Sequence, residues 1–212
     1  EDADLLVFNK PGWVVCHPSK NGPWSSLVGA AREARGLDKV HLVSRLDRET
    51  SGLVLLARNH LTASLLQTAF AQRRTCKRYR ALLRGRLEET RTTESLLEPD
   101  PRSPVVVQQR VAFGGRGKGA VTTFRPLEYW GAHTLAEVIP ETGRKHQIRV
   151  HAAWLGHPVL GDKIYGGDPT CYLEFIEGGW TPRLETVLGF PRQALHAAEL
   201  TVWGEDFRHT FR

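Results

Sequence analysis

The chain has 212 residues, of which 41% are hydrophobic and 25% charged, and these fractions exclude a disordered protein. A chain of this length buries about 70% of its extended surface, so it needs no disulfide or metal to fold. No stretch approaches the ~18 uncharged apolar residues of a membrane helix, and acidic residues 1–4 exclude a secretion signal, so we expect a cytoplasmic protein without membrane contact.

The first third of the chain alternates short apolar runs with turn signals. Residues 5–8 predict a strand that stops at residues 9–12 and resumes at residues 13–15. A helix follows, capped by Ser25 or Ser26 and closed by Gly36. Residues 53–57 predict a fully buried strand, and Leu61, Leu65, Leu66, Ala69 and Phe70 share one helical face.

The rest of the chain is richer in strands than in helices. Alternation predicts a strand at residues 79–84, and apolar runs predict others at 105–107, 120–124, 134–138 and 195–203. Residues 148–155 have helical spacing, residues 180–190 read as irregular, and residues 87–104 read as a surface excursion. We expect one α+β domain over residues 1–212, built on a large mixed or antiparallel sheet.

The cysteines indicate the cellular compartment, and the charge indicates the kind of partner. Cys16, Cys76 and Cys171 are scattered and odd in number, which is typical of reduced cytoplasmic thiols rather than of a disulfide framework or a metal site. Lysine and arginine outnumber the acidic residues by 29 to 23, a net charge of +6.

The basic residues gather in two places. Residues 71–87 hold seven of them and no carboxylate, and residues 144–151 hold a second cluster. A charge run is often only a solvated face, but two clusters beside unusual motifs favour a partner rich in phosphates.

Two polar segments could carry chemistry. Asp47 is placed in a loop that leads into the buried strand at residues 53–57, although taken alone the segment also fits a loop in which Asp47 or Thr50 merely caps a turn. In residues 141–151, Gly143 allows a sharp turn and basic residues then begin a helix, with Lys145 and Arg149 expected on one face. Arg149 lies beside apolar positions and needs a carboxylate partner, which is also consistent with a purely structural ion pair.

Several familiar sites are excluded. His146 and His151 are five residues apart rather than four, and no HExxH sequence is present. The glycine-rich residues 114–119 lack the Gly-Lys-Ser/Thr of a phosphate loop and predict a flexible hairpin tip between strands. No serine lies in a Gly-x-Ser-x-Gly context.

Taken in order, the polar motifs resemble the RluA-type pseudouridine synthase family over residues 4–203. The matching segments are 9–12 (NKPG) with 17–18 (HP), 45–47 (RLD) with 50–52 (TSG), 79–81 (YRA), 142–151 (TGRKHQIRVH) with 156–162 (GHPVLGD), and 195–197 (LHA).

The resemblance implies a fold and an activity. The fold is a single catalytic domain with a large, bent, mostly antiparallel mixed sheet, flanking helices and a central RNA-binding cleft. The activity is isomerisation of uridine in ribosomal or transfer RNA to pseudouridine, with base flipping and with no metal or other cofactor. We expect RNA as the partner, no small-molecule cofactor, and a monomer.

The resemblance also assigns roles to residues. Asp47 matches the essential aspartate, Tyr79 the tyrosine packed on the target base, and Arg149 the arginine paired with that aspartate. Arg45 matches the arginine that enters the RNA stack, and Leu195 lines the uracil pocket. Lys77, Arg144, Lys145 and His146 are candidates for contacts with the RNA, chiefly its backbone.

Two features depart from the family. Ser44 stands where a histidine usually precedes Arg45, which affects local hydrogen bonding rather than chemistry. No S4-type RNA-binding domain is recognisable in this chain.

The expected chemistry uses each residue differently. Asp47 either attacks C1′ or takes a proton from C2′; it works ionised, which burial would oppose and the charge of Arg149 would favour. Tyr79 offers an aromatic face and a hydroxyl for removing the C5 proton. Two other functions fit less well: an RNA-binding module without chemistry, and hydrolytic removal of the base.

Overall fold

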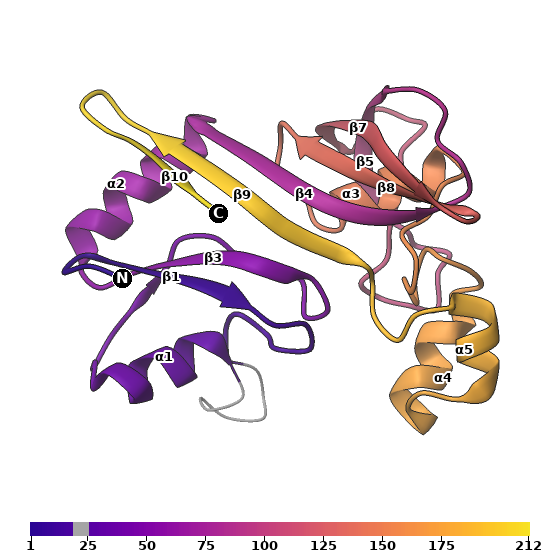
Figure 1. Ribbon diagram of the computed structural model, residues 1–212, viewed down its shortest axis with the longest axis horizontal. Helices are drawn as coiled ribbons and strands as arrows, with labels where there is room; N and C mark the ends of the chain where they lie inside the picture. The colour runs from indigo at the N-terminus through magenta and orange to yellow at the C-terminus, as the bar shows by residue number, and fades with distance from the viewer. Residues whose placement is uncertain (19–25) are drawn as a thin grey trace. The chain divides into compact units, whose positions relative to one another are not determined.

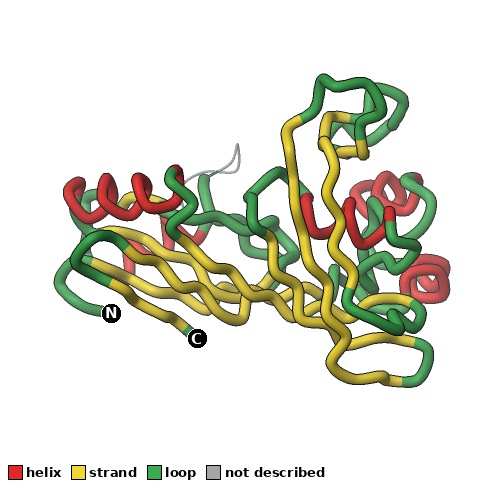
Figure 2. Tube along the Cα trace, turned by 90° about the horizontal axis from the view of Figure 1, so that it is seen from above, coloured by secondary structure: helices red, strands yellow, loops and turns green. Residues whose placement is uncertain are grey.

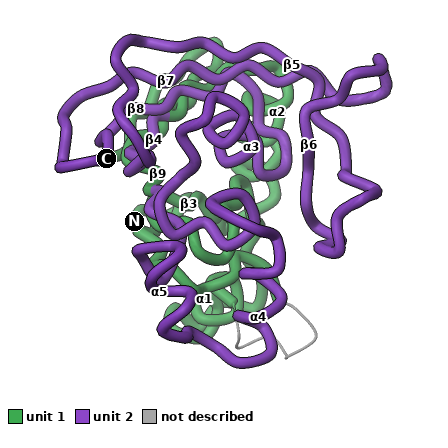
Figure 3. Tube along the Cα trace, turned by 90° about the vertical axis from the view of Figure 1, so that its right-hand side faces the viewer, with its two compact units in different colours: residues 1–77, 196–212 green, residues 78–195 purple. Residues whose placement is uncertain are grey.

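The computed structural model describes residues 1–18 and 26–212. These residues contain ten strands and five helices, joined by turns and loops (Figure 1). Strands account for most of the regular structure (Figure 2) and are assigned to one mixed sheet. The chain divides into two compact units, residues 1–77 with 196–212 and residues 78–195 (Figure 3).

The first unit is built around β3 (Ser51–Ala57), every residue of which is buried. β3 pairs antiparallel with β1 (Leu5–Lys10) and β2 (His41–Leu42), and parallel with β9 (Leu195–Trp203). β10 (Arg208–Phe211) pairs antiparallel with β9. The strands expected at residues 53–57 and 195–203 are therefore confirmed.

Two helices cover opposite faces of β3, because successive strand side chains point to opposite sides. Val54 and Leu56 pack with α1 (Leu27–Arg35), while Leu53 and Leu55 pack with α2 (His60–Ala71). The Ser26 hydroxyl caps α1 by accepting from the Gly29 amide at 3.1 Å, and Gly36 ends it with φ +58°. The alternative cap, Ser25, lies outside the described residues.

One expectation for the first unit is wrong, and another is confirmed only in part. Residues 13–15 do not resume the strand: Trp13 has φ +74°, and Val15 makes only an isolated bridge to Ser26. On α2 the buried side chains are Ala63, Leu66 and Ala69, whereas Leu61 and Leu65 are exposed.

The second unit is an antiparallel sheet with the order β4-β8-β7-β5-β6. Its strands are β4 (Thr75–Arg84, entering from the first unit), β5 (Arg91–Pro99), β6 (Gln109–Val111), β7 (Lys118–Trp130) and β8 (His133–Pro140). α3 (Gln147–Trp154) packs against one face through Ile148 and Ala152, and α4 (Thr170–Gly178) and α5 (Pro182–Leu188) pack together around Leu184 and Leu188.

In the second unit, the sequence analysis missed one polar strand and one short helix, and it predicted one strand that does not form. The expected surface excursion at residues 87–104 contains β5, which the sequence analysis missed because threonine and glutamate residues make this strand polar. Residues 105–107 form turns rather than a strand. Residues 180–190 contain α5, whose signals were all present: Thr181 as N-cap, Pro182 in the first turn and Gly189 with φ +71°. The glycine-rich residues 114–119 do connect strands, but β6 and β7 both pair with β5 rather than with each other.

The expected α+β class with a mostly antiparallel mixed sheet is confirmed, and the central RNA-binding cleft stays a prediction. In the part of the chain that the structure describes, no helix combines the length and the apolar character that a membrane crossing requires.

Candidate active site

Asp47 lies in the loop before β3, as expected, and the backbone on both sides of it is held by the N-terminal segment. Lys10, which is fully buried, donates from Nζ to the carbonyl oxygens of Arg48 (3.1 Å), Pro11 and Val14 (both 2.8 Å). Asp47 itself is half-buried. The backbone that follows Asp47 is therefore held by a buried cation.

The backbone before Asp47 is held by the thiol of Cys16. Cys16 Sγ accepts from the Leu46 amide at 3.3 Å and donates to the Leu46 carbonyl at 3.5 Å. Ser44, where the resemblance leads one to expect histidine, makes a hydrogen bond of its own. Its hydroxyl accepts from the Leu55 amide of β3 at 3.1 Å. The local hydrogen bonding at this departure is thus satisfied.

The loop reaches β3 at a point of very close backbone approach. Gly52 has φ +111°, and a Cβ there would lie 2.3 Å from the carbonyl oxygen of Ala197 on β9. Next to it, Ser51 Oγ lies 3.0 Å from His196 Nδ1. Only glycine fits this contact, which explains the glycine at position 52.

Tyr79 and Leu195 belong to the second unit and share an apolar cluster. Tyr79 lies on β4 opposite Val138 of β8, and packs half-buried against a cluster that includes Leu195 and Ile148 of α3. The structure therefore brings together two of the expected substrate-contacting residues and the helix that carries Arg149.

Arg149 is buried and paired with a carboxylate that the sequence analysis did not assign. Arg149 Nε donates to Asp162 Oδ2 at 2.6 Å and Nη2 donates to Asp162 Oδ1 at 2.9 Å. Asp162 Oδ1 also accepts from the amides of Ile164 and Tyr165. Burial acts most strongly on Asp162 and opposes its ionisation, but the charge and hydrogen bonds of Arg149 and the two amides outweigh it and lower the pKa of Asp162.

This pair fixes the orientation of the guanidinium within the second unit. The Tyr165 ring lies under Arg149, with the guanidinium carbon 5.1 Å from the ring centroid. The Tyr165 hydroxyl in turn lies 2.9 Å from His146 Nδ1. Pairing of Arg149 with Asp47 stays a prediction.

The expected helix phase for Lys145 and Arg149 is wrong. α3 begins at Gln147, and His146 is its N-cap with φ +55°, so Lys145 precedes the helix. Lys145 is exposed, whereas Arg149 is only 6% exposed. Arg144 is tied by its Nε to the Gly119 carbonyl at 3.0 Å.

The remaining candidates divide by their surroundings. Arg45 is exposed in the Asp47 loop, as an RNA contact would need to be. Lys77 instead lies with its Nζ 5.2 Å from the Phe70 ring centroid, and burial lowers the pKa of this amine. Lys77 is therefore the weaker candidate for a phosphate contact.

Sequence reasoning missed the supporting residues: Lys10, Cys16 and Asp162. Lys10 and Asp162 lie inside the matching motifs, so the sequence contains them. It does not reveal that Lys10 binds the Arg48 carbonyl 38 residues away or that Asp162 binds Arg149 13 residues away. Among residues 1–18 and 26–212, no three histidine, cysteine or acidic side chains are grouped in a way that would hold a metal ion.

The decisive comparison is with protein families. Residues 4–154 match the family described as RNA pseudouridylate synthase. The chain belongs to this family. The match includes Asp47, Tyr79 and Arg149, and it confirms the resemblance noted in the sequence.

Curated members of the RNA pseudouridylate synthase family resemble the chain over nearly all its length. Ribosomal large subunit pseudouridine synthase D of Xylella fastidiosa is 35% identical over 216 residues, and that of Escherichia coli (strain K12) is 33% identical over 207. These alignments cover 100% and 96% of this chain but 61% of each relative. The chain therefore spans about three-fifths of the length of these relatives.

Solved structures of the family agree with the fold. Human RNA Pseudouridylate Synthase Domain Containing 1 superposes with a TM-score of 0.77 at 27% identity, covering 100% of this chain and 80% of that one. Human RNA Pseudouridylate Synthase Domain Containing 4 gives a TM-score of 0.74 at 24% identity, covering 99% and 85%, and supports the fold alone.

Proposed function

We propose that this chain isomerises a uridine of ribosomal RNA to pseudouridine, with Asp47 as the essential residue. The observation that carries the proposal is the family match over residues 4–154, which includes Asp47 in a loop held on both flanks by buried hydrogen bonds. Ribosomal RNA is preferred to transfer RNA because the curated relatives are named for the large ribosomal subunit.

The reaction conserves atoms and electrons. The bond between C1′ and N1 of uracil breaks, the base turns, a bond between C1′ and C5 forms, and the C5 proton leaves while N1 gains one. No oxidant, reductant or water is consumed, so the chemistry requires no cofactor to balance it. Asp47 supports the positive charge that develops on the sugar, by attack at C1′ or by taking a C2′ proton.

The other residues serve this step. The positive charge of Arg149 stabilises the ionised Asp47, and Asp162 holds Arg149 in the orientation required. Tyr79 packs on the base and receives the C5 proton through its hydroxyl. The base leaves the RNA stack first, at a cost of a few kcal/mol, and Arg45 fills the space.

The test is release of tritium from large-subunit ribosomal RNA transcribed with uridine labelled at C5. The unaltered protein should release tritium, and Asp47→Asn, nearly isosteric, should release none while binding the transcript with unchanged affinity. Asp38→Asn is the matched control, because Asp38 is exposed on another loop of the same unit.

The same experiment separates the two other functions. Binding without tritium release by the unaltered, folded protein would favour an RNA-binding module. Free uracil and abasic RNA as products would favour hydrolysis. Either result would contradict the proposal.

A further inference from the structure

Two aromatic rings of the second unit are exposed side by side. Phe113, just after β6, is 83% exposed, and Trp154, the last residue of α3, is 54% exposed. Their ring centroids are 5.6 Å apart and their planes are inclined by 58°. Large apolar side chains are usually left in water together only where something covers them.

Two segments near Phe113 in the fold are rich in basic residues. The segments 112–119 and 141–146 carry four basic residues, Arg116, Lys118, Arg144 and Lys145, against one acidic residue, Glu141. The segments lie together because Arg144 Nε donates to the Gly119 carbonyl at 3.0 Å and the Glu141 amide donates to the Val121 carbonyl at 3.0 Å. These two neighbouring segments therefore carry four basic residues against one acidic residue.

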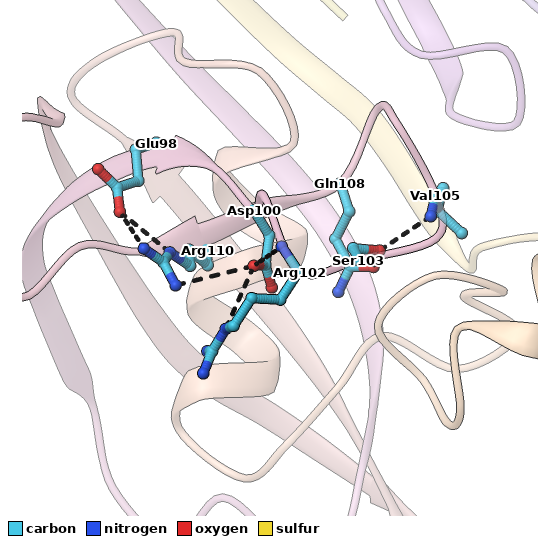
Figure 4. A network of polar contacts seen from close by, with 7 residues as sticks. All are labelled: Glu98, Asp100, Arg102, Ser103, Val105, Gln108 and Arg110. Atoms are coloured by element: carbon cyan, nitrogen blue, oxygen red, sulfur yellow. Dashed lines mark hydrogen bonds and ion pairs between the residues drawn. The ribbon is translucent and has the colours of Figure 1, made fainter.

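The nearby Arg110 does not add to this charge, because carboxylates neutralise it. Arg110 Nε and Nη2 donate to Glu98 Oε1 at 3.0 and 2.7 Å, and Nη1 lies 3.8 Å from Asp100 Oδ1 (Figure 4). Asp100 also accepts from the Arg102 amide. This network fixes the strands from which the Phe113 segment leaves.

The aromatic pair stands on a common apolar base. Val111 and Ala120, at the two ends of the Phe113 segment, belong to one buried cluster with Leu97 and with Val150 of α3. Both rings are therefore attached to the same packed core. A ligand would find them already in place, which reduces the entropy lost on binding.

We propose that Phe113 and Trp154, with Arg116, Lys118 and Lys145, form a stacking site for unpaired nucleotides of the RNA outside the reacting uridine. Aromatic faces among exposed cations are the chemistry by which proteins hold single-stranded RNA: bases stack on the rings and phosphates meet the cations. Stacking accepts any base, so the site adds affinity and register rather than sequence preference. The inference rests on the proposed function only in taking RNA as the ligand.

The test compares two fluorescent probes, an oligoribonucleotide of eight uridines and an abasic oligomer of the same length, by anisotropy with the full chain. The unaltered protein should bind the uridine oligomer more tightly. Phe113→Leu and Trp154→Leu, which keep the apolar contact but lose an aromatic face, should each weaken uridine binding about tenfold and leave abasic binding unchanged.

Charge variants should behave differently. Arg116→Gln and Lys118→Gln should weaken binding of both oligomers and reduce its salt dependence, because they remove phosphate contacts. Trp130→Leu is the matched control: Trp130 lies on β7 and is 52% exposed, much like Trp154, but it should leave both affinities unchanged.

Two results would overturn the proposal: uridine binding unchanged in both leucine variants, or equal losses for the two oligomers. Unchanged thermal midpoints of the variants show that the fold is intact. Tritium release by the unaltered protein tests the proposed function separately, so an active enzyme with unchanged leucine variants would refute only the stacking site. An inactive protein that shows the tenfold losses would refute only the isomerase.

Discussion

Arg149 donates two hydrogen bonds to the two carboxylate oxygens of Asp162, at 2.6 and 2.9 Å, and both side chains are buried. A buried pair contributes little net stability, but removing one partner leaves an uncompensated charge. Asp162→Asn should therefore lower the free energy of unfolding by about 3 to 5 kcal/mol, measured by urea denaturation.

The control for this prediction is an exposed ion pair. Glu89 lies 2.9 Å from Arg91, with both side chains more than half exposed. Glu89→Gln should change the free energy of unfolding by less than about 1 kcal/mol. Equal effects of Asp162→Asn and Glu89→Gln would contradict the role given to the buried pair.

The hydroxyl of Tyr79 can be removed without disturbing its packing. Tyr79→Phe should keep the free energy of unfolding within about 1 kcal/mol and reduce the single-turnover rate of tritium release by about 100-fold or more. Tyr129→Phe is the control, because the Tyr129 hydroxyl donates to the Leu87 carbonyl, at 3.1 Å, and its loss should not slow the reaction. A fully active Tyr79→Phe variant would remove Tyr79 from the proton transfer.

Lys10 should matter to both stability and rate. Lys10→Met keeps the length of the side chain but leaves the carbonyls of Pro11, Val14 and Arg48 without this donor. We expect a loss of about 2 to 4 kcal/mol in the free energy of unfolding and a lower kcat, since the Asp47 loop loosens. Lys39→Met, at an exposed position, should change neither quantity; a kcat unchanged by Lys10→Met would show that the loop does not depend on Lys10.

Gly52→Ala tests the contact between β3 and β9. The new Cβ would meet the Ala197 backbone at 2.3 Å, at a φ of +111° that alanine rarely adopts, so a loss of about 2 to 4 kcal/mol in the free energy of unfolding is expected. Gly178→Ala, at the end of α4 with no atom within 4 Å, should leave thermal stability unchanged or slightly higher. Equal tolerance of both substitutions would show that the strands can separate.

His151 makes the stability of the fold depend on pH. Its ring nitrogens lie 2.9 Å from the hydroxyls of Ser95 and Thr122, and burial lowers the pKa of His151 to about 4. The unfolded chain takes up this proton near pH 6.5 and the folded chain only near 4. The contribution of neutral His151 is therefore complete above pH 6.5 and is lost as the pH falls toward 4, by about 3 kcal/mol in all.

The measurement compares the unaltered protein with His151→Gln in urea at pH 7 and pH 4.5. The difference in their free energies of unfolding should shrink by about 2 to 3 kcal/mol at the lower pH. A constant difference for His151→Gln would mean that this histidine does not couple to folding.

What the sequence could predict depends on how locally each feature is encoded. The strand at 195–203 and the helix ended by Gly36 follow from apolar runs and caps within a few residues, and both are confirmed. β5 was missed because its threonine and glutamate residues are stabilised by neighbouring strands rather than by hydrophobicity.

The site shows the same limit. The ordered motifs were enough to name Asp47, Tyr79 and Arg149 as candidates, because the identity and order of the residues can be read from the sequence. The partner of Arg149 could not be read off, because helical spacing says nothing of a carboxylate that follows the helix and folds back. The sequence analysis also placed Arg149 on a face shared with Lys145, because it assumed that the helix begins before Gln147. It therefore did not predict that Arg149 is buried.

The parallel contact of β3 with β9 joins Ser51 to His196, residues separated by most of the chain. Residues 78–195 are one continuous stretch of the chain. The unit that carries Asp47 is instead assembled from two stretches, and its sheet lacks β9 and β10 without residues 196–212. A chain cut before residue 196 would thus keep all of residues 78–195 but would leave β3, which follows the Asp47 loop, without its parallel neighbour β9.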